Sequence, residues 1–311
     1  MNSYTSARVY ITVPNALSLN QSQLDQYYSD IKAANVNWVR ITLPWNVVQP
    51  NAPTVTTTTT WWLIFPITTT TVTPTFEWAA ADLAINRALA AGLNVQVLLA
   101  PPKPNWVARI DPSTFTNFAK YVANRYKPGG AGIAPGNAGR FVAEYQVWHE
   151  PNVIANWTGT IVSASQYTAV LKAAYTAIKA SHSGAVVVAA GLQACTSLGG
   201  TRQDPVAFLS AMYSSGAKGY LDVAAYNPLT LPIDQFPEPP APSGLTMKQA
   251  DAFYAALKAR DAGRKVYWRF GFQTPTMSTV QQAAYLDTMR WFAEERKAWV
   301  AGIVLPQWRD Y

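Results

Sequence analysis

Short apolar stretches alternate with amphipathic stretches along almost the whole chain. The amphipathic stretches lie near residues 20–34, 78–92, 113–126, 165–181, 205–215, 246–262 and 278–297 and have helical spacing. The apolar stretches have the length of β-strands and span roughly residues 8–13, 37–42, 94–99, 142–149, 185–190, 221–226, 265–270 and 301–307. This repeated alternation predicts an α/β fold, a (β/α)8 TIM barrel of eight parallel strands. An open doubly wound sheet is the alternative, but no glycine-rich phosphate loop follows the first strand.

Residues 54–75 interrupt this alternation after the second predicted strand. Blocks of five and four threonines flank the apolar residues 61–67, which begin with Trp61 and Trp62. Threonine favours strands, so the segment predicts a hairpin, and a disordered low-complexity loop is the alternative. Because adjacent exposed tryptophans favour aggregation, we expect the tip to fold over the barrel mouth as a lid. The chain is then one TIM-barrel domain, 1–311, with a lid at 54–75 and no clear eighth helix.

Composition narrows the possible partners. The chain has 311 residues, of which 49% are hydrophobic and only 13% charged, against an ordinary charged share of about a quarter. Its net charge of +7 comes from scattered lysines and arginines, which argues against nucleic-acid binding. No apolar run is long enough to span a membrane, and the single Cys195 excludes an internal disulfide. We expect a monomer that binds a small molecule. The start at Met1 without a visible signal peptide suggests a mature domain produced recombinantly in a cytoplasm.

The strongest candidate for chemistry is Glu150. It lies in the sequence Trp148-His149-Glu150-Pro151-Asn152, directly after a predicted strand. The C-terminal ends of the strands are where a TIM barrel carries its catalytic groups. We therefore expect Glu150 to be catalytic, while a structural ion pair with Arg40 or Arg269 is the alternative.

These five residues resemble the W-N-E-P-N signature of clan A glycoside hydrolases, especially family 39-like enzymes, with His149 in place of the asparagine. Residues 266–274 resemble the penultimate strand of that family, whose pattern is roughly V-W-x-T-E-F-G-W-x-T. Arg269 stands where the nucleophilic glutamate is expected. The resemblance implies a TIM barrel that has kept its acid/base residue, Glu150, and lost its nucleophile. Together with the threonine blocks, this loss suggests a redesigned barrel.

The replacement of the nucleophile decides which reactions are open. A retaining glycosidase needs two carboxyl groups about 5 Å apart, and arginine cannot form the glycosyl-ester intermediate. Arg269 beside Glu150 would also lower the pKa of the carboxyl group, whereas an acid catalyst needs a raised pKa. We therefore expect ordinary retaining hydrolysis to be lost.

Further candidate groups stand at or near predicted strand ends. His149 either converges on Glu150 or packs behind the barrel. Lys103 lies beside Trp106 and could form a Schiff base, or it could point into solvent. The candidate ligand-binding residues are Tyr10, Arg40, Trp45, Trp106, Trp148, Asn227, Trp268, Gln307 and Trp308. Their tryptophans would stack on a sugar or an aromatic ring, although strand alternation sends some of them into the core. Two distant histidines and one cysteine give no metal signature, and no cofactor is expected.

Four functions remain open at this point. In the first, Glu150 is the general base of an engineered catalyst for proton abstraction from a small aromatic substrate, as in Kemp elimination, with Arg269 or Lys103 stabilising the phenolate. The second is an inactive barrel that binds a sugar or a hydrophobic ligand. The third is retro-aldol chemistry at Lys103, and the fourth is residual glycoside hydrolysis.

Overall fold

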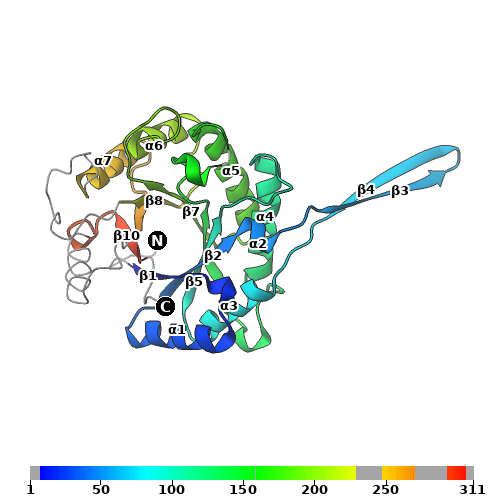
Figure 1. Ribbon diagram of the computed structural model, residues 1–311, viewed down its shortest axis with the longest axis horizontal. Helices are drawn as coiled ribbons and strands as arrows, with labels where there is room; N and C mark the ends of the chain where they lie inside the picture. The colour runs from blue at the N-terminus through cyan, green and yellow to red at the C-terminus, as the bar shows by residue number, and fades with distance from the viewer. Residues whose placement is uncertain (1–7, 158, 229–246, 270–292, 306–311) are drawn as a thin grey trace.

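The computed structural model describes residues 8–157, 159–228, 247–269 and 293–305. Parallel strands close into a barrel in the order β1-β10-β9-β8-β7-β6-β5-β2, which confirms the predicted TIM barrel (Figure 1). The strands are β1 (Arg8–Val13), β2 (Trp38–Pro44), β5 (Asn94–Ala100), β6 (Val142–Val147), β7 (Val186–Gln193), β8 (Val223–Asn227), β9 (Lys265–Arg269) and β10 (Val300–Leu305).

Helices surround this barrel, as Figure 1 shows. The α-helices are α1 (Gln21–Ala33), α2 (Trp45–Val48), α3 (Ala79–Ala90), α4 (Pro112–Tyr126), α5 (Ala164–Ser181), α6 (Pro205–Ser214) and α7 (Met247–Lys258). Side chains of Asn20, Asp111, Ser163 and Asp204 accept hydrogen bonds from the first turns of α1, α4, α5 and α6, which fixes where these helices begin. Of the predicted helix 278–297, residues 278–292 lie outside the described residues, and residues 293–295 are helical. None of the helices described is long and apolar enough to cross a membrane.

Side chains that alternate along the strands form two separate apolar regions. One faces the helices and contains most of the buried residues. Cys195 is buried, as predicted, with 2% of its surface exposed. The other fills the barrel interior and contains Tyr10, Val188, Val223, Ala225, Tyr267, Ala301 and Val304. The interior also holds buried charged and polar residues, which extend along the barrel toward the C-terminal ends of the strands.

Glu144 on β6 is the centre of a hydrogen-bond network inside the barrel. Its Oε1 accepts hydrogen bonds from Arg8 Nη1 at 2.8 Å and Tyr267 Oη at 3.0 Å, and Tyr10 Oη lies 3.1 Å from both carboxylate oxygens. Gln96 Nε2 donates to Oε2 at 2.9 Å. Burial raises the pKa of Glu144, although these donors and the charge of Arg8 oppose the rise. The network gives the fully buried carboxyl group of Glu144 its hydrogen-bond partners. It fills the barrel interior on the N-terminal side of the candidate site.

The threonine-rich segment forms a two-stranded antiparallel hairpin of β3 (Thr54–Trp62) and β4 (Phe65–Thr73), as predicted. It does not fold over the barrel: it projects away from it in Figure 1, and Trp61 and Ile64 are 70% and 79% exposed. The predicted lid is therefore wrong. The arms carry threonines on both faces, and the tip carries the pair Trp61 and Pro66 on one face and Trp62 and Phe65 on the other. No single apolar face exists that could pack against the barrel.

Candidate active site

Glu150 lies in a strained turn directly after β6. Trp148 and Glu150 both have positive φ angles, of 72° and 45°, in the left-handed region that non-glycine residues rarely adopt. The turn is held by backbone hydrogen bonds from Trp148 N to Leu99 O and from Glu150 N to Gly191 O. Such conformations cost about 1–3 kcal/mol each and are typical of functional sites, so this turn supports a role for Glu150.

Both carboxylate oxygens of Glu150 accept a hydrogen bond from an amide side chain. Asn227 Nδ2, at the end of β8, donates to Oε1 at 2.8 Å, and Asn156 Nδ2 donates to Oε2 at 3.1 Å. Arg269 Nη1, at the end of β9, lies 3.7 Å from Oε1, and His149 Nε2 lies 3.5 Å from Oε2. The structure thus brings together the predicted residues Glu150, Arg269, His149 and Asn227. The Glu150 side chain keeps 14% of its surface accessible.

Burial dominates the electrostatics of this carboxyl group. It raises the pKa of Glu150, while the hydrogen bond from Asn227 and the charges of Arg269 and Arg40 oppose the rise. The sequence-based expectation of a lowered pKa is therefore wrong in direction, because desolvation outweighs the charge pairing. Burial also lowers the pKa of His149, and the charges of Arg269 and Arg40 lower it further. At neutral pH the imidazole is therefore neutral, and its contact with Glu150 is not an ion pair.

Arg40 lies inside the barrel on β2 and is 2% exposed. Its Nη1 donates to the neutral Gln146 Oε1 at 3.2 Å. Burial and repulsion from Arg269 lower the pKa of Arg40, whereas attraction to Glu150 raises it. Arg40, Arg269 and Glu150 therefore interact electrostatically as one group. The resemblance had already implied that Arg269 lies beside Glu150.

Gly191 on β7 positions the amide that holds Glu150. A Cβ atom at this glycine would lie 2.2 Å from Asn227 Oδ1, and 2.8 and 2.9 Å from Cγ and Nδ2. Any side chain at position 191 would therefore displace Asn227 from Glu150. The carbonyl of Gly191 also accepts the hydrogen bond from Glu150 N. Gly191 therefore positions both Asn227 and Glu150.

Several predicted ligand-binding residues have other positions. Trp45, Trp148 and Trp268 have no exposed surface and pack in the region between barrel and helices, so the prediction that they stack on a ligand is wrong. Trp45 begins α2 and Trp148 directly follows β6, whereas Trp268 lies on β9, where strand alternation directs its side chain outward. Tyr10 is likewise completely buried, in the network around Glu144, and is not available to a ligand.

Trp106 and Lys103 lie outside the group around Glu150. Trp106 is half-buried against Trp45. Lys103 Nζ donates to the carbonyl of Val107 in its own loop, and no contact joins it to Glu150 within the described part of the chain. Gln307 and Trp308 lie outside the described residues.

Sequence reasoning missed Gln146, Asn156 and Gly191. Gln146 had a usable signal, because it follows Glu144 at a spacing of two in an otherwise apolar strand, which places both side chains inside the barrel. Asn156 reaches Glu150 through a short 3-10 turn, Ile154–Asn156, and no spacing rule predicts that approach. Gly191 is one of several glycines in the chain, and only the packed structure distinguishes it.

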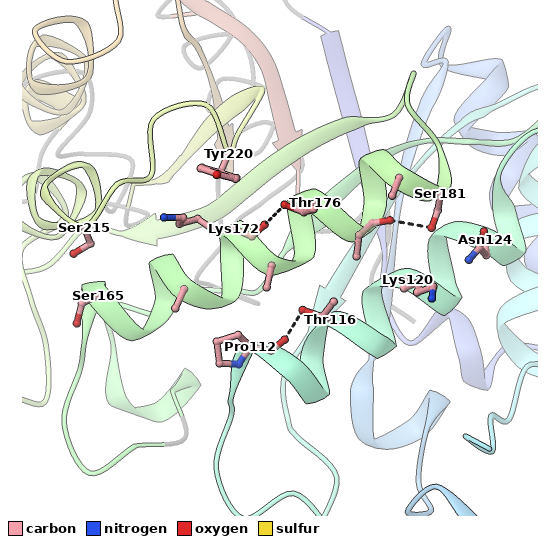
Figure 2. Close-up of a pocket in the computed structure, with 14 residues that line it drawn as sticks. Pro112, Thr116, Lys120, Asn124, Ser165, Lys172, Thr176, Ser181, Ser215 and Tyr220 are labelled. Carbon is pink, nitrogen blue, oxygen red and sulfur yellow. Dashed lines mark hydrogen bonds between the residues drawn. The ribbon is translucent and has the colours of Figure 1, made fainter. Parts of the chain in front are cut away.

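A large groove lies elsewhere, on the outer surface between α4 and α5, as Figure 2 shows. Its volume is about 960 Å³ and its walls include Lys120, Lys172 and Tyr220. The hydroxyl groups of Thr116, Thr176 and Ser181 donate to carbonyls of their own helices, so they are already satisfied (Figure 2). Within the described ranges, no cluster of three or more histidine, cysteine or acidic side chains could hold a metal ion. The arrangement around Glu150 is thus the better candidate for chemistry.

No protein-family model and no curated protein sequence matches the chain. Solved structures do match its fold. An endo-1,4-β-mannanase from Rhizomucor miehei is 14% identical with a TM-score of 0.62, over 97% of this chain and 85% of that one. An endo-1,4-β-D-mannanase from Thermotoga petrophila is 12% identical with a TM-score of 0.59, over 97% and 87%.

A GH39 β-xylosidase from Caulobacter crescentus is 13% identical with a TM-score of 0.60, over 99% of this chain and 63% of the other. The chain has the TIM-barrel fold of these glycoside hydrolases. At such low identity the likeness concerns the fold alone, and the chemistry must be argued from the residues around Glu150.

Proposed function

We propose that this barrel catalyses proton abstraction from a small substrate, with Glu150 as the general base. The observation that carries the proposal is a partly accessible carboxylate at the strand ends whose pKa is raised by burial. The raised pKa makes Glu150 a stronger base at neutral pH, because desolvation destabilises the carboxylate relative to the acid. The amides of Asn227 and Asn156 orient both oxygens without adding charge.

Arg269 would stabilise the charge that develops on the substrate. Its Nη1 lies 3.7 Å from Glu150 Oε1, beyond hydrogen-bonding distance, so the guanidinium stays available to a second acceptor. In a Kemp elimination, Glu150 takes the proton from the carbon atom and the carbon–hydrogen electron pair forms the nitrile. The nitrogen–oxygen bond breaks, and the leaving phenolate oxygen binds Arg269. This reaction is the simplest probe of the proposal.

The decisive test compares turnover of a nitrobenzisoxazole by the wild-type protein and by Glu150→Gln. A positioned general base contributes about 10²–10⁴-fold, and we expect the variant to lose an acceleration of that order. Glu294→Gln removes one carboxylate at an exposed position and is the matched control. Equal turnover in the wild type and in Glu150→Gln would refute the proposal.

A second candidate function is binding of a sugar or another small ligand without turnover. Arg269 at the position of the expected nucleophile favours it over hydrolysis, because no glycosyl ester can form there. We expect no release of aryl alcohol from activated aryl glycosides. Release accompanied by a trapped glycosyl-enzyme would instead support residual hydrolysis. An engineered origin stays a prediction. Schiff-base chemistry at Lys103 is disfavoured by the hydrogen bond of its Nζ to Val107 O.

A further inference from the structure

Among the described residues, the group around Glu150 carries more positive than negative charge. Two guanidinium groups, Arg40 and Arg269, face one carboxylate, and the neighbouring His149 is neutral at pH 7. Arg40 is buried against a neutral amide, Gln146, rather than against an acid. Burying a charge without a counter-ion is costly, so this imbalance requires an explanation.

Several donors in the same group have no hydrogen-bond partner among the described residues. They are Arg40 Nε, Arg269 Nε and Thr12 Oγ1, all buried. Thr12 is the register partner of Arg40 on the adjacent strand, so its hydroxyl and the guanidinium lie on neighbouring strands at one level of the barrel. Native proteins rarely leave buried donors unsatisfied, and those that remain call for an explanation, of which a bound ion is one.

We infer that the barrel binds a small oxyanion between Arg40 and Arg269, so that the preferred substrates carry a carboxylate or form an oxyanion product. A carboxylate offers about four acceptor sites and matches the planar fork of a guanidinium, which the unpaired Nε donors could complete. The inference extends the proposed function and takes from it the position of the substrate beside Glu150.

The position of Arg269 links this oxyanion site to the base. Arg269 Nη1 lies 3.7 Å from Glu150 Oε1, so a ligand held by the same guanidinium lies next to the carboxylate. Repulsion between the ligand and Glu150 would weaken binding, and removing the charge at position 150 should strengthen it. This expectation separates an anion held beside Glu150 from one bound elsewhere on a basic protein.

Calorimetric titration with benzoate and with its neutral analogue benzamide tests the inference. We expect the wild-type protein to bind benzoate and not benzamide. Arg269→Gln should weaken benzoate binding about tenfold or more, the usual effect of losing one charge-assisted hydrogen bond. Arg260→Gln changes the net charge equally at an exposed position beyond α7 and should leave the affinity unchanged.

Glu150→Gln should bind benzoate more tightly, which keeps the test informative even if Arg269→Gln does not fold. Equal affinity for benzoate and benzamide, or equal affinity in wild type and Arg269→Gln, would overturn the inference. Either result, combined with Glu150-dependent elimination, would leave the general-base proposal standing. Benzoate binding without Glu150-dependent turnover would leave the oxyanion site and remove the proposed reaction.

Discussion

Arg269 faces Glu150 with 3.7 Å between Nη1 and Oε1, whereas Asn227 Nδ2 approaches the same oxygen to 2.8 Å. The closest partner of the carboxylate is therefore a neutral amide and not the guanidinium. Burial then determines the direction of the pKa shift, and the carboxyl group remains a usable base.

The elimination rate should depend on pH through Glu150. Because burial raises the pKa of this carboxyl group above its ordinary value of 4.5, the active carboxylate forms only at a higher pH than usual. We expect the rate constant to rise with pH and to level off once Glu150 is ionised. A rate profile measured at constant ionic strength checks this, and a profile that is flat across the acidic range would argue for another base.

Gly191→Ala should disturb the site without touching Glu150 directly. The new Cβ would lie 2.2 Å from Asn227 Oδ1 and displace the amide from the carboxylate. Since the hydrogen bond from Asn227 lowers the pKa of Glu150, losing it should move the pH–rate profile to higher pH. Gly136→Ala, where a Cβ meets nothing within 4 Å, is the matched control. Identical profiles in both variants would contradict the positioning role of Gly191.

Glu144→Ala should destabilise the fold. The change leaves Arg8 and the hydroxyl groups of Tyr10 and Tyr267 without their common acceptor. Removing one partner of a buried pair costs about 3–5 kcal/mol, and the partial exposure of Arg8 favours the lower end. Chemical denaturation measures the loss, and Glu144→Gln, which keeps one acceptor oxygen, should lose less. Equal stability of Glu144→Ala and wild type would show that the network contributes little.

Lys103 should not form a Schiff base. Its Nζ donates to the carbonyl of Val107 within its own loop, and nothing in the described structure joins it to the group around Glu150. We expect mass spectrometry to find no adduct at Lys103 after incubation with a β-hydroxy ketone and borohydride. A stoichiometric adduct confined to this lysine would revive the retro-aldol reaction.

Replacing residues 56–71 with a Gly-Ser turn should leave thermal unfolding nearly unchanged. The arms and tip of the hairpin are exposed and do not pack on the barrel, so their removal deletes little buried apolar area. We also expect unchanged benzoate binding and weaker self-association by light scattering, because the exposed tryptophans are removed. A fall in melting temperature of several degrees would show that the hairpin stabilises the barrel.

The sequence predicted the elements that depend on local periodicity. Strand and helix positions follow from spacings of two and of three to four residues, and the position of Glu150 follows from the end of β6. The balance between burial and charge at Glu150 depends on how closely Asn227 and Arg269 approach, and no local pattern contains that distance. The outward direction of Trp268 depends on the phase of β9, which the aromatic character of a residue does not reveal.

The hairpin also shows where this barrel tolerates added chain. Thr54 and Thr73 are register partners, so the segment leaves and re-enters the barrel at nearly one point. Closing a longer loop between two adjacent points adds only about 0.6 kcal/mol for each doubling of its length. The connection between β2 and α3 is therefore a grafting site on the same side of the barrel as Glu150, where loops can be exchanged independently of the eight strands.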